Sequence, residues 1–436
     1  MPRARNVLQD TLRILLLTLG LALSSCGGGG SSDDTPLPPP PPVNELRSNK
    51  PRVTAPVVSS EDAATFARDN LAFSVDLYHE LRTSEPHNFI FSQTSISTAL
   101  AMLYAGAATT TAEQMAETLH FSLPAPRLHA AFNSLDLALS SPPPTNNPAA
   151  FRLTVANSLW IQKDFPVLPA FLDALAEHYG TGLFTQDFAA APEPARVAIN
   201  RWAEFHTEGQ IPNLFPERSI TDLTRFVLAN ALFFHGDWKA PFRKDSPIGT
   251  FHALSGDVMV PMMYGSGNAA IWAGSGWNAA SLSYVGDTTS MIVVVPDAGT
   301  FADFESVLTA ELLGDILAPA GRIPGADLIL PRFKFATEVS LIETLSALGM
   351  PNAFDDSADF SGLNGARDLR VQSVFHTAII AVDEKGTTAS AATGVGGGVT
   401  SAPPTLIVDR PFLFFIRHDP TGAILFQGRV VDPSRQ

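Results

Sequence analysis

The hydrophobic pattern of this chain has helical spacing in its early part and strand spacing in its later part. Between Ser59 and Leu81 apolar residues recur on one helical face, and Ser59 and Asp62 have capping-box spacing. Two further helical patterns begin near Ser95 and at Thr111. Patterns of buried strands cover 154–161, 226–234, 291–295, 328–335, 371–382, 406–408, 412–416 and 424–431. This order favours an α+β fold over alternating β-α-β units.

The N-terminal segment is predicted to be an export signal. Three arginines precede an apolar run from Ile14 to Leu23, which is too short to span a bilayer as a mature helix. The run ends in Leu23-Ser24-Ser25-Cys26, which resembles the bacterial lipobox. We therefore predict that residues 1–25 are a lipoprotein signal peptide and that Cys26 is lipidated. The alternative is an ordinary signal peptide followed by a chance cysteine.

The segment after Cys26 is predicted to be a tether. It reads GGGGSSDDTPLPPPPP, a composition that predicts a flexible half followed by a stiff polyproline half. We assign 26–58 to the lipidated cysteine and tether, and 59–436 to one folded domain. The protein is then exported and lipid-anchored to the bacterial cell envelope. Gly27, rather than aspartate, follows the cysteine, so we expect the outer membrane or cell surface.

Composition and motifs exclude several classes of function. Lys plus Arg number 28 and Asp plus Glu 43, so the net charge of −15 argues against a nucleic-acid partner. The single cysteine permits no intramolecular disulfide. The chain lacks the H-E-x-x-H, G-x-S-x-G and P-loop motifs. We predict that it is not an enzyme and uses no metal or cofactor.

The segment from Glu384 to Pro404 carries the most specific signal. Residues 386–404 hold no charge, and small residues occupy the alternate positions Thr387, Ala389, Ala391 and Thr393. Such alternation suits a strand that slides between two others, because its side chains would enter the core without a clash or a buried charge. The alternative is a Gly/Ala-rich linker. Strand patterns on both sides argue against a linker.

At this point the chain resembles the serpin family over about 375 residues. The blocks that carry the resemblance follow in family order: Asn88 to Ser95, Thr111 to Met115, Ala156 to Trp160, Asn200-x-Trp202, Thr207-x-Gly209-x-Ile211, Asn230 to Trp238, Leu330 to Phe333, Leu348 to Met350, Ala358 to Gly362, His376, Glu384 to Thr393 and Arg410 to Phe412. Gln93 departs from the pattern, since the family usually has proline there.

The resemblance implies the serpin fold of three β-sheets and eight or nine helices, with an exposed reactive-centre loop. It implies a suicide-type protease inhibitor, whose cleaved loop inserts into the main sheet and traps the protease as an acyl-enzyme. The hinge of the loop would be Glu384, Lys385, Gly386, Thr387, Ala389, Ala391 and Ala392. A polar shutter under the opening strands would comprise Ser92, Ser95, Asn230 and His376, and Trp238 would mark the breach where the hinge enters.

Spacing to Pro411 places the reactive bond within the loop. Pro411 lies 27 positions after Glu384, as in inhibitory members of the family, and the resemblance then implies that the bond is Thr400–Ser401, with Val399–Thr400 as the alternative. Either bond offers a small uncharged residue to the specificity pocket. The expected partner is therefore an elastase-like or subtilisin-like serine protease or a cysteine protease, acting on a monomer.

One feature leaves a second function open. Glycines at 394 and 396–398 precede the predicted bond, and glycine is a poor strand residue, so insertion of this part would be slow. Slow insertion would let the protease hydrolyse the bond and leave. The alternative is a non-inhibitory serpin that acts as a binding or carrier protein.

Overall fold

The computed structural model describes residues 43–141, 145, 147–318, 320–387 and 403–435. Their α-helices are α1 (Ser60–Ser84), α2 (Gln93–Tyr104), α3 (Thr109–Thr118), α4 (Ala125–Leu139), α5 (Pro169–Ala174), α6 (Pro192–His206), α7 (Phe301–Ser306), α8 (Ala310–Leu317), α9 (Leu341–Leu348) and α10 (Ser361–Asn364). Three shorter helical turns are η1 (Pro148–Ala150), η2 (Leu175–Tyr179), which is a π-helix, and η3 (Pro351–Ala353).

Side-chain caps fix where the first two helices begin. The Ser59 hydroxyl accepts the backbone N–H of Asp62 at 3.0 Å, so α1 begins where the sequence pattern predicted. The Ser92 hydroxyl accepts the N–H of Ser95 at 3.2 Å and caps α2 in the same way. Helix α6 has no side-chain cap, but it begins with Pro192, which suits a first helical turn.

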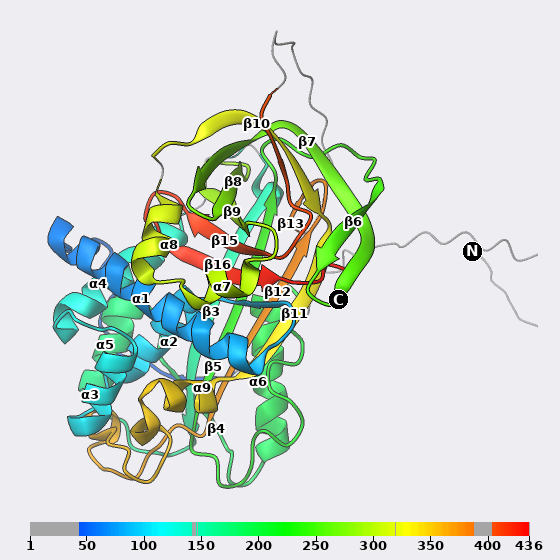
Figure 1. The fold of residues 1–436 in the computed structure, drawn as a ribbon. Coiled ribbons are helices and arrows are strands. Elements are labelled where there is room, and N and C mark those ends of the chain that lie inside the picture. Colours follow the sequence, from blue (N-terminus) through cyan, green and yellow to red (C-terminus); the bar gives the residue numbers. More distant parts are fainter. Residues whose placement is uncertain (1–42, 142–144, 146, 319, 388–402, 436) are drawn as a thin grey trace, which may run out of the picture. The chain divides into compact units, whose positions relative to one another are not determined.

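Seven strands form the main sheet, in the order β1-β4-β3-β5-β13-β12-β11. Their bounds are β1 (Asn44–Leu46), β3 (Phe151–Gln162), β4 (Leu183–Gln186), β5 (Phe226–Asp237), β11 (Phe333–Ser340), β12 (Ser373–Val382) and β13 (Gly386–Thr387). Figure 1 shows β5 in green, β12 in orange and β11 in yellow running side by side. Strand β5 is almost continuously apolar and buried, as a central strand covered on both faces requires.

The remaining strands form a second network, β14-β10-β7-β8-β9-β15-β16-β2, with β6 on β7. The bounds are β2 (Phe89–Phe91), β6 (Ile248–Ala253), β7 (Gly256–Gly274), β8 (Trp277–Ser283), β9 (Thr289–Pro296), β10 (Ile323–Pro331), β14 (Thr405–Ile407), β15 (Phe412–His418) and β16 (Ile424–Val430). Strand β7 pairs with β6 in its first half and with β8 in its second. The network therefore consists of two sheets that share β7, and the fold has three sheets.

The predicted α+β class and three-sheet architecture are confirmed, and the described residues form ten α-helices, where eight or nine were expected. One predicted strand is wrong in extent. The range 328–335 is two strands, β10 and β11, which belong to different sheets and are separated by Arg332. Pro331 has no N–H to donate and ends β10, which lets the chain cross from one sheet to the other. No helix among the described residues is long and apolar enough to cross a membrane.

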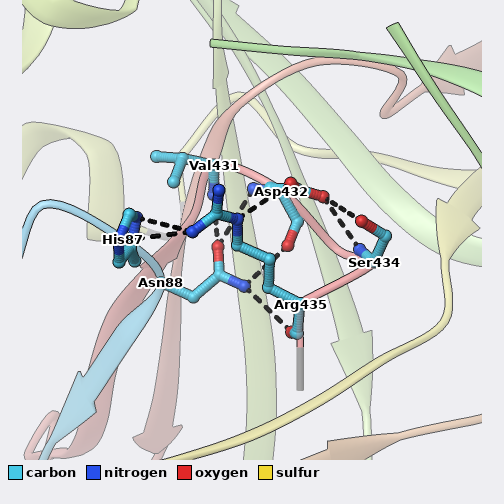
Figure 2. Close-up of polar contacts among 6 residues, drawn as sticks. All are labelled: His87, Asn88, Val431, Asp432, Ser434 and Arg435. Atoms are coloured by element: carbon cyan, nitrogen blue, oxygen red, sulfur yellow. Dashed lines mark hydrogen bonds and ion pairs between the residues drawn. The ribbon is translucent and has the colours of Figure 1, made fainter. Parts of the chain in front are cut away.

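The described C-terminal residues are fastened to the start of β2. The Asn88 side chain accepts the N–H groups of Val431 and Asp432 at 2.8 and 3.0 Å and donates to the Asp432 carbonyl at 2.7 Å. Figure 2 shows these contacts together with the Asp432–Arg435 ion pair at 3.2 Å. The described C-terminal residues are thereby fixed beside β2, the last strand of the second network.

Candidate functional site: a partly open seam in the main sheet

The main sheet contains a seam between β5 and β12. The two strands pair directly, and in parallel, over Val227–Ala231 and Ser373–Thr377. Beyond this stretch, within the described residues, no strand pairing joins 232–234 of β5 to 378–381 of β12. Each strand there pairs only with its outer neighbour, β3 or β11. The seam therefore contains a slot bordered by two strand edges.

The two-residue strand β13 occupies the mouth of this slot. Thr387 pairs with Gly236 of β5 on one side and with Val382 of β12 on the other. Gly386 permits this close approach, because a Cβ there would lie 2.1 Å from the Gly236 carbonyl oxygen. The structure thus places the first two small residues of the predicted hinge inside the sheet.

Glu384 anchors the hinge just before β13. Its carboxylate accepts hydrogen bonds from Arg332 and from the Ser246 hydroxyl, and its carbonyl accepts the Phe242 N–H at 2.8 Å. Burial alone would raise the pKa of this carboxyl, but the bonds from Ser246 and Arg332 hold it below its usual value. Lys385 contributes its carbonyl, which accepts the backbone N–H of Trp238 at 2.7 Å.

Trp238, predicted to mark the breach, lies at the mouth of the slot. Its indole N–H donates to the Asp383 carbonyl at 2.9 Å, and its ring stacks on Tyr284 with centroids 4.5 Å apart. The Tyr284 hydroxyl in turn shares a 2.8 Å hydrogen bond with the Thr387 hydroxyl, and burial raises the pKa of Tyr284. The aromatic pair thus contacts the hinge through Asp383 and Thr387.

The four predicted shutter residues meet beneath the directly paired part of β5 and β12. His376 is fully buried, and register places it directly beside Asn230. The Ser92 backbone N–H donates to His376 Nε2 at 3.1 Å, so the ring proton resides on Nδ1 and is donated to Asn230 Oδ1 at 2.5 Å. Asn230 Nδ2 then donates to the Ser95 hydroxyl at 2.8 Å.

Burial lowers the pKa of His376 to about 3. The ring is therefore neutral at physiological pH, in agreement with the tautomer that its hydrogen bonds require. A proton on Nε2 would remove the acceptor of the Ser92 N–H and place an unpaired charge in the core. The cluster accordingly couples the start of α2 to the seam only while His376 is neutral.

Sequence reasoning missed one member of this cluster, Asn157 of β3. Its Oδ1 accepts hydrogen bonds from Asn230 at 2.6 Å and from the Ser95 hydroxyl at 3.1 Å, and register places it opposite Asn230. The available signal was an asparagine within the otherwise buried strand pattern 154–161. Buried amides need partners, so this position predicts a polar cluster.

Several predicted residues lie outside the described part of the chain. They are the hinge residues Ala389, Ala391 and Ala392, the reactive-bond residues Val399, Thr400 and Ser401, and Cys26. Among the described residues, no group of three or more His, Cys, Asp or Glu side chains is arranged to hold a metal ion.

Comparison with known proteins identifies the family. The family model "Serpin (serine protease inhibitor)" matches residues 68–433, so the chain belongs to the serpin family. It is 36% identical over 388 residues to the leukocyte elastase inhibitor of Bos taurus, covering 84% of this chain and 98% of the relative. It is 35% identical over 368 residues to an uncharacterized serpin-like protein of Thermococcus kodakarensis, covering 83% and 84%.

Solved serpin structures share the fold. The native state of tengpin, a thermophilic serpin, matches with a TM-score of 0.77 and 25% identity, covering 89% of this chain and 97% of that one. Human thyroxine-binding globulin with thyroxine matches with a TM-score of 0.76 and 28% identity, covering 85% and 99%. Uncleaved ovalbumin also matches with a TM-score of 0.76 and 28% identity, covering 84% and 100%. Relatives thus include protease inhibitors and proteins with other names and ligands.

The buried His376 predicts acid sensitivity of the native fold. Because its folded pKa, about 3, lies below the ordinary value of 6.5, its neutral form stabilises the fold fully above pH 6.5 and progressively less as the pH falls toward 3. This one group should remove about 2 kcal/mol of unfolding free energy between pH 7 and pH 5. Urea unfolding at several pH values measures the loss.

The variant His376→Phe should be less stable at pH 7 by about 2–4 kcal/mol, because it removes the acceptor of the Ser92 N–H and the donor to Asn230 Oδ1. It should also lose less stability than the native chain between pH 7 and pH 5. His252→Gln is the control, since His252 is exposed and paired with Asp257. If the stability of His376→Phe depended on pH as strongly as that of the native chain, His376 would not be the cause of the acid sensitivity.

Proposed function

We propose that this serpin is a suicide-type protease inhibitor, in which the chain after Thr387 is the bait and the β5–β12 seam receives it. The observation that carries the proposal is β13, which lies at the mouth of a slot where no described strand pairs with the facing edges of β5 and β12, and which leads directly into the uncharged segment 388–402. A strand continued along β13 would border both edges of the slot. Cleavage of the segment would release its first part to enter.

The register of β13 predicts how far insertion proceeds without disrupting the sheet. Extending the pairs Thr387–Gly236 and Thr387–Val382 brings Ala391 opposite Leu232 and Ala378, which fills the slot. The next residue, Ala392, would come opposite Ala231 and Thr377, the last directly paired residues of β5 and β12. Insertion beyond Ala391 therefore requires the two strands to separate.

Alternation along the same register supports the roles of the small residues. Thr387 faces Tyr284, so Ala389, Ala391 and Thr393 would face the same buried side. The β12 neighbours on that side, Ala378 and Ile380, are fully buried. We propose that the hinge comprises Glu384, Lys385, Gly386, Thr387, Ala389, Ala391 and Ala392, that Ser92, Ser95, Asn230 and His376 act as the shutter, and that Trp238 acts as the breach.

The chemistry belongs to the target protease. Its nucleophile attacks the carbonyl carbon of Thr400, the bond to the nitrogen of Ser401 breaks, and Ser401 leaves as a new amino terminus. The acyl group remains attached to the protease. Insertion of the freed hinge would then carry the acylated enzyme away from Ser401 before water hydrolyses the ester.

A small-residue specificity pocket fits this bait. Thr400, or Val399 in the alternative register, offers neither a cation nor a large aromatic ring. We propose an elastase-like or subtilisin-like serine protease, or a cysteine protease, as the target. The similarity to leukocyte elastase inhibitors is in keeping with this class.

We further propose that the protein is a monomer held at the bacterial cell envelope by a lipid on Cys26. The motif at 23–26 and the Gly/Ser/Pro-rich composition of 27–42 support the anchor. A tethered inhibitor would intercept foreign or stray proteases at the outer membrane or cell surface.

A second candidate function is a binding or carrier protein without inhibition. The similarity to thyroxine-binding globulin with its thyroxine favours this candidate, as do the glycines at 394 and 396–398. Its signature would be rapid cleavage of the bait with no covalent complex.

Incubation with pancreatic elastase tests the principal proposal. We expect an SDS-stable complex in which the protease is esterified to Thr400, with Ser401 as the new amino terminus of the C-terminal fragment. Gel electrophoresis and N-terminal sequencing give both readouts. Cleavage outside 397–402, or complete cleavage without complex, would overturn the inhibitory assignment.

Substitution within the hinge tests the predicted register. Ala391→Arg would place a charge on the buried side of the inserted strand, which should lower the yield of SDS-stable complex at least about tenfold while cleavage continues. Ser390→Arg, on the opposite side, is the matched control and should retain more complex. Equal loss in both variants would contradict the register.

The lipid anchor is tested by Cys26→Ser expressed in a bacterial host that processes lipoproteins. The parent chain should partition with the membrane fraction and incorporate labelled palmitate, and the variant should do neither. A parent chain recovered without label would show that the cysteine is incidental.

A further inference from the structure

Residues Asn44–Val53, here called the strap, contact the folded body although they precede α1 and fall within the predicted tether. Asn44–Leu46 form β1, which pairs antiparallel with β4 and is the outermost strand of the main sheet. After Leu46 the strap crosses α5 and η2, and it ends against α4. Its sequence shows no periodic hydrophobic pattern. Its charged side chains Arg47, Lys50 and Arg52 make contacts with the folded body.

The strap is bound by charged and hydrogen-bonded contacts along its length. Lys50 forms ion pairs with Asp173 and Glu177, both at 3.2 Å, and these carboxylates belong to α5 and η2. The Ser48 hydroxyl donates to Asp173 at 2.5 Å, and the Val53 N–H donates to the Glu177 carbonyl at 2.9 Å. The strap is thus joined to the helical segment that leads into β4.

The far end of the strap is joined to α4. Arg52 donates to Asn133 Oδ1 at 2.9 Å and forms an ion pair with Asp136 at 2.6 Å. Asn133 is fully buried, and its Nδ2 donates back to the Val53 carbonyl at 2.7 Å. The exposed ion pairs of the strap contribute little individually, so the hydrogen bonds to Asn133 are its firmest attachment.

Two glycines make room for the strap. A Cβ on Gly182 would lie 2.4 Å from the Leu46 carbonyl oxygen, and a Cβ on Gly180 would lie 2.8 Å from Arg52 Cδ. Gly180 also has a left-handed backbone, with φ at 65°, which independently favours glycine. The surface under the strap therefore lacks side chains at the two points where the strap comes closest.

We propose that the strap is a brake on widening of the β5–β12 seam. An added strand widens a sheet by about 4.8 Å. Strands β5, β3, β4 and β1 are paired in sequence on one side of the seam, so they would move together. Helix α4 is not part of this set and packs on α1 and α2.

The displacement would then fall between η2 and α4. Besides the strap, two direct contacts cross this joint: His129 Nδ1 of α4 lies 2.7 Å from the Tyr179 hydroxyl, and Asn133 Nδ2 donates to the Glu177 carbonyl at a long 3.5 Å. The strap spans the joint, since it is bonded to Glu177 on one side and to Asn133 on the other. Separation of η2 from α4 must break one of these attachments, which slows loop insertion.

This inference rests on the proposed insertion mechanism, and the full-length chain tests both. Arg52→Ala removes the Arg52 bonds to Asn133 and Asp136 and leaves only the Val53 carbonyl bonded to α4. Gly182→Val drives the strap from its place by contact with Leu46. Arg127→Ala is the matched control, because it removes an exposed arginine of α4 whose partner, Asp62, lies on α1 and not across the joint. Gly314→Ala, where a Cβ meets only Leu71 at an ordinary 3.4 Å, is the glycine control.

The measurement is the rate at which intact protein, held at elevated temperature, converts to the urea-resistant inserted form. We expect Arg52→Ala and Gly182→Val to convert about threefold to tenfold faster than the parent, as expected when one or two opposing hydrogen bonds are lost. Both controls should stay within about twofold of the parent rate. Unchanged rates in the two strap variants would overturn the proposal.

A second readout separates a brake from a merely structural role. Thermal unfolding of loop-nicked protein, in which the strand is already inserted, should differ little between Arg52→Ala and the parent. Equal destabilisation of intact and nicked forms, with unchanged conversion rates, would show a structural role only and overturn the brake. If nicking stabilises none of the proteins, the insertion mechanism itself is wrong, and the brake is rejected with it.

Discussion

The direct pairing of β5 with β12 is the interaction on which the rest of the structure depends. It joins the two strands over five residue pairs, while farther along β13 takes the place between them. A sheet that is closed at one end and occupied by a short strand at the other has two available arrangements. The ladder bonds that an added strand forms, at a net ~0.5–1.5 kcal/mol each, are comparable with the ~1–2 kcal/mol per residue needed to order it. Side-chain burial therefore decides which arrangement is more stable.

The polar cluster at the seam is suited to a sheet in which β5 and β12 stay paired before the proposed insertion and separate during it. A purely apolar contact between β5 and β12 would be indifferent to small sliding movements. The bonds from Ser92 to His376 and from His376 to Asn230 instead specify one register, and each buried group loses its partner if the strands separate unevenly. Neutral His376 makes this specificity possible, because a charged ring could not accept the Ser92 N–H.

The sequence was sufficient for features that depend on local pattern or on spacing. It placed α1 and the buried strand β5, and the resemblance to the serpin family pointed to the four residues that gather at the seam. It failed where a feature depends on partners that are distant in the chain. The division of 328–335 into two strands depends on which sheet each half joins, and the role of Asn157 depends on its register opposite Asn230. The strap was assigned to the tether, because its polar residues show no periodic pattern. Their structure comes from contacts with Asp173, Glu177 and Asn133, which lie far along the chain.

The geometry of the seam also orders the steps of the proposed insertion. The residues up to Ala391 would add ladder bonds without breaking any between β5 and β12, so this stage meets little resistance. At Ala392 the pair Ala231–Thr377 must open, and at Thr393 the bond between Asn230 and His376 must break. The barrier would therefore lie immediately beyond the point where the free slot ends, and before the glycines at 394 and 396–398 are reached. Because those glycines would enter the sheet after the barrier, their poor strand propensity would lower the stability of the inserted form more than it would lower the rate of insertion.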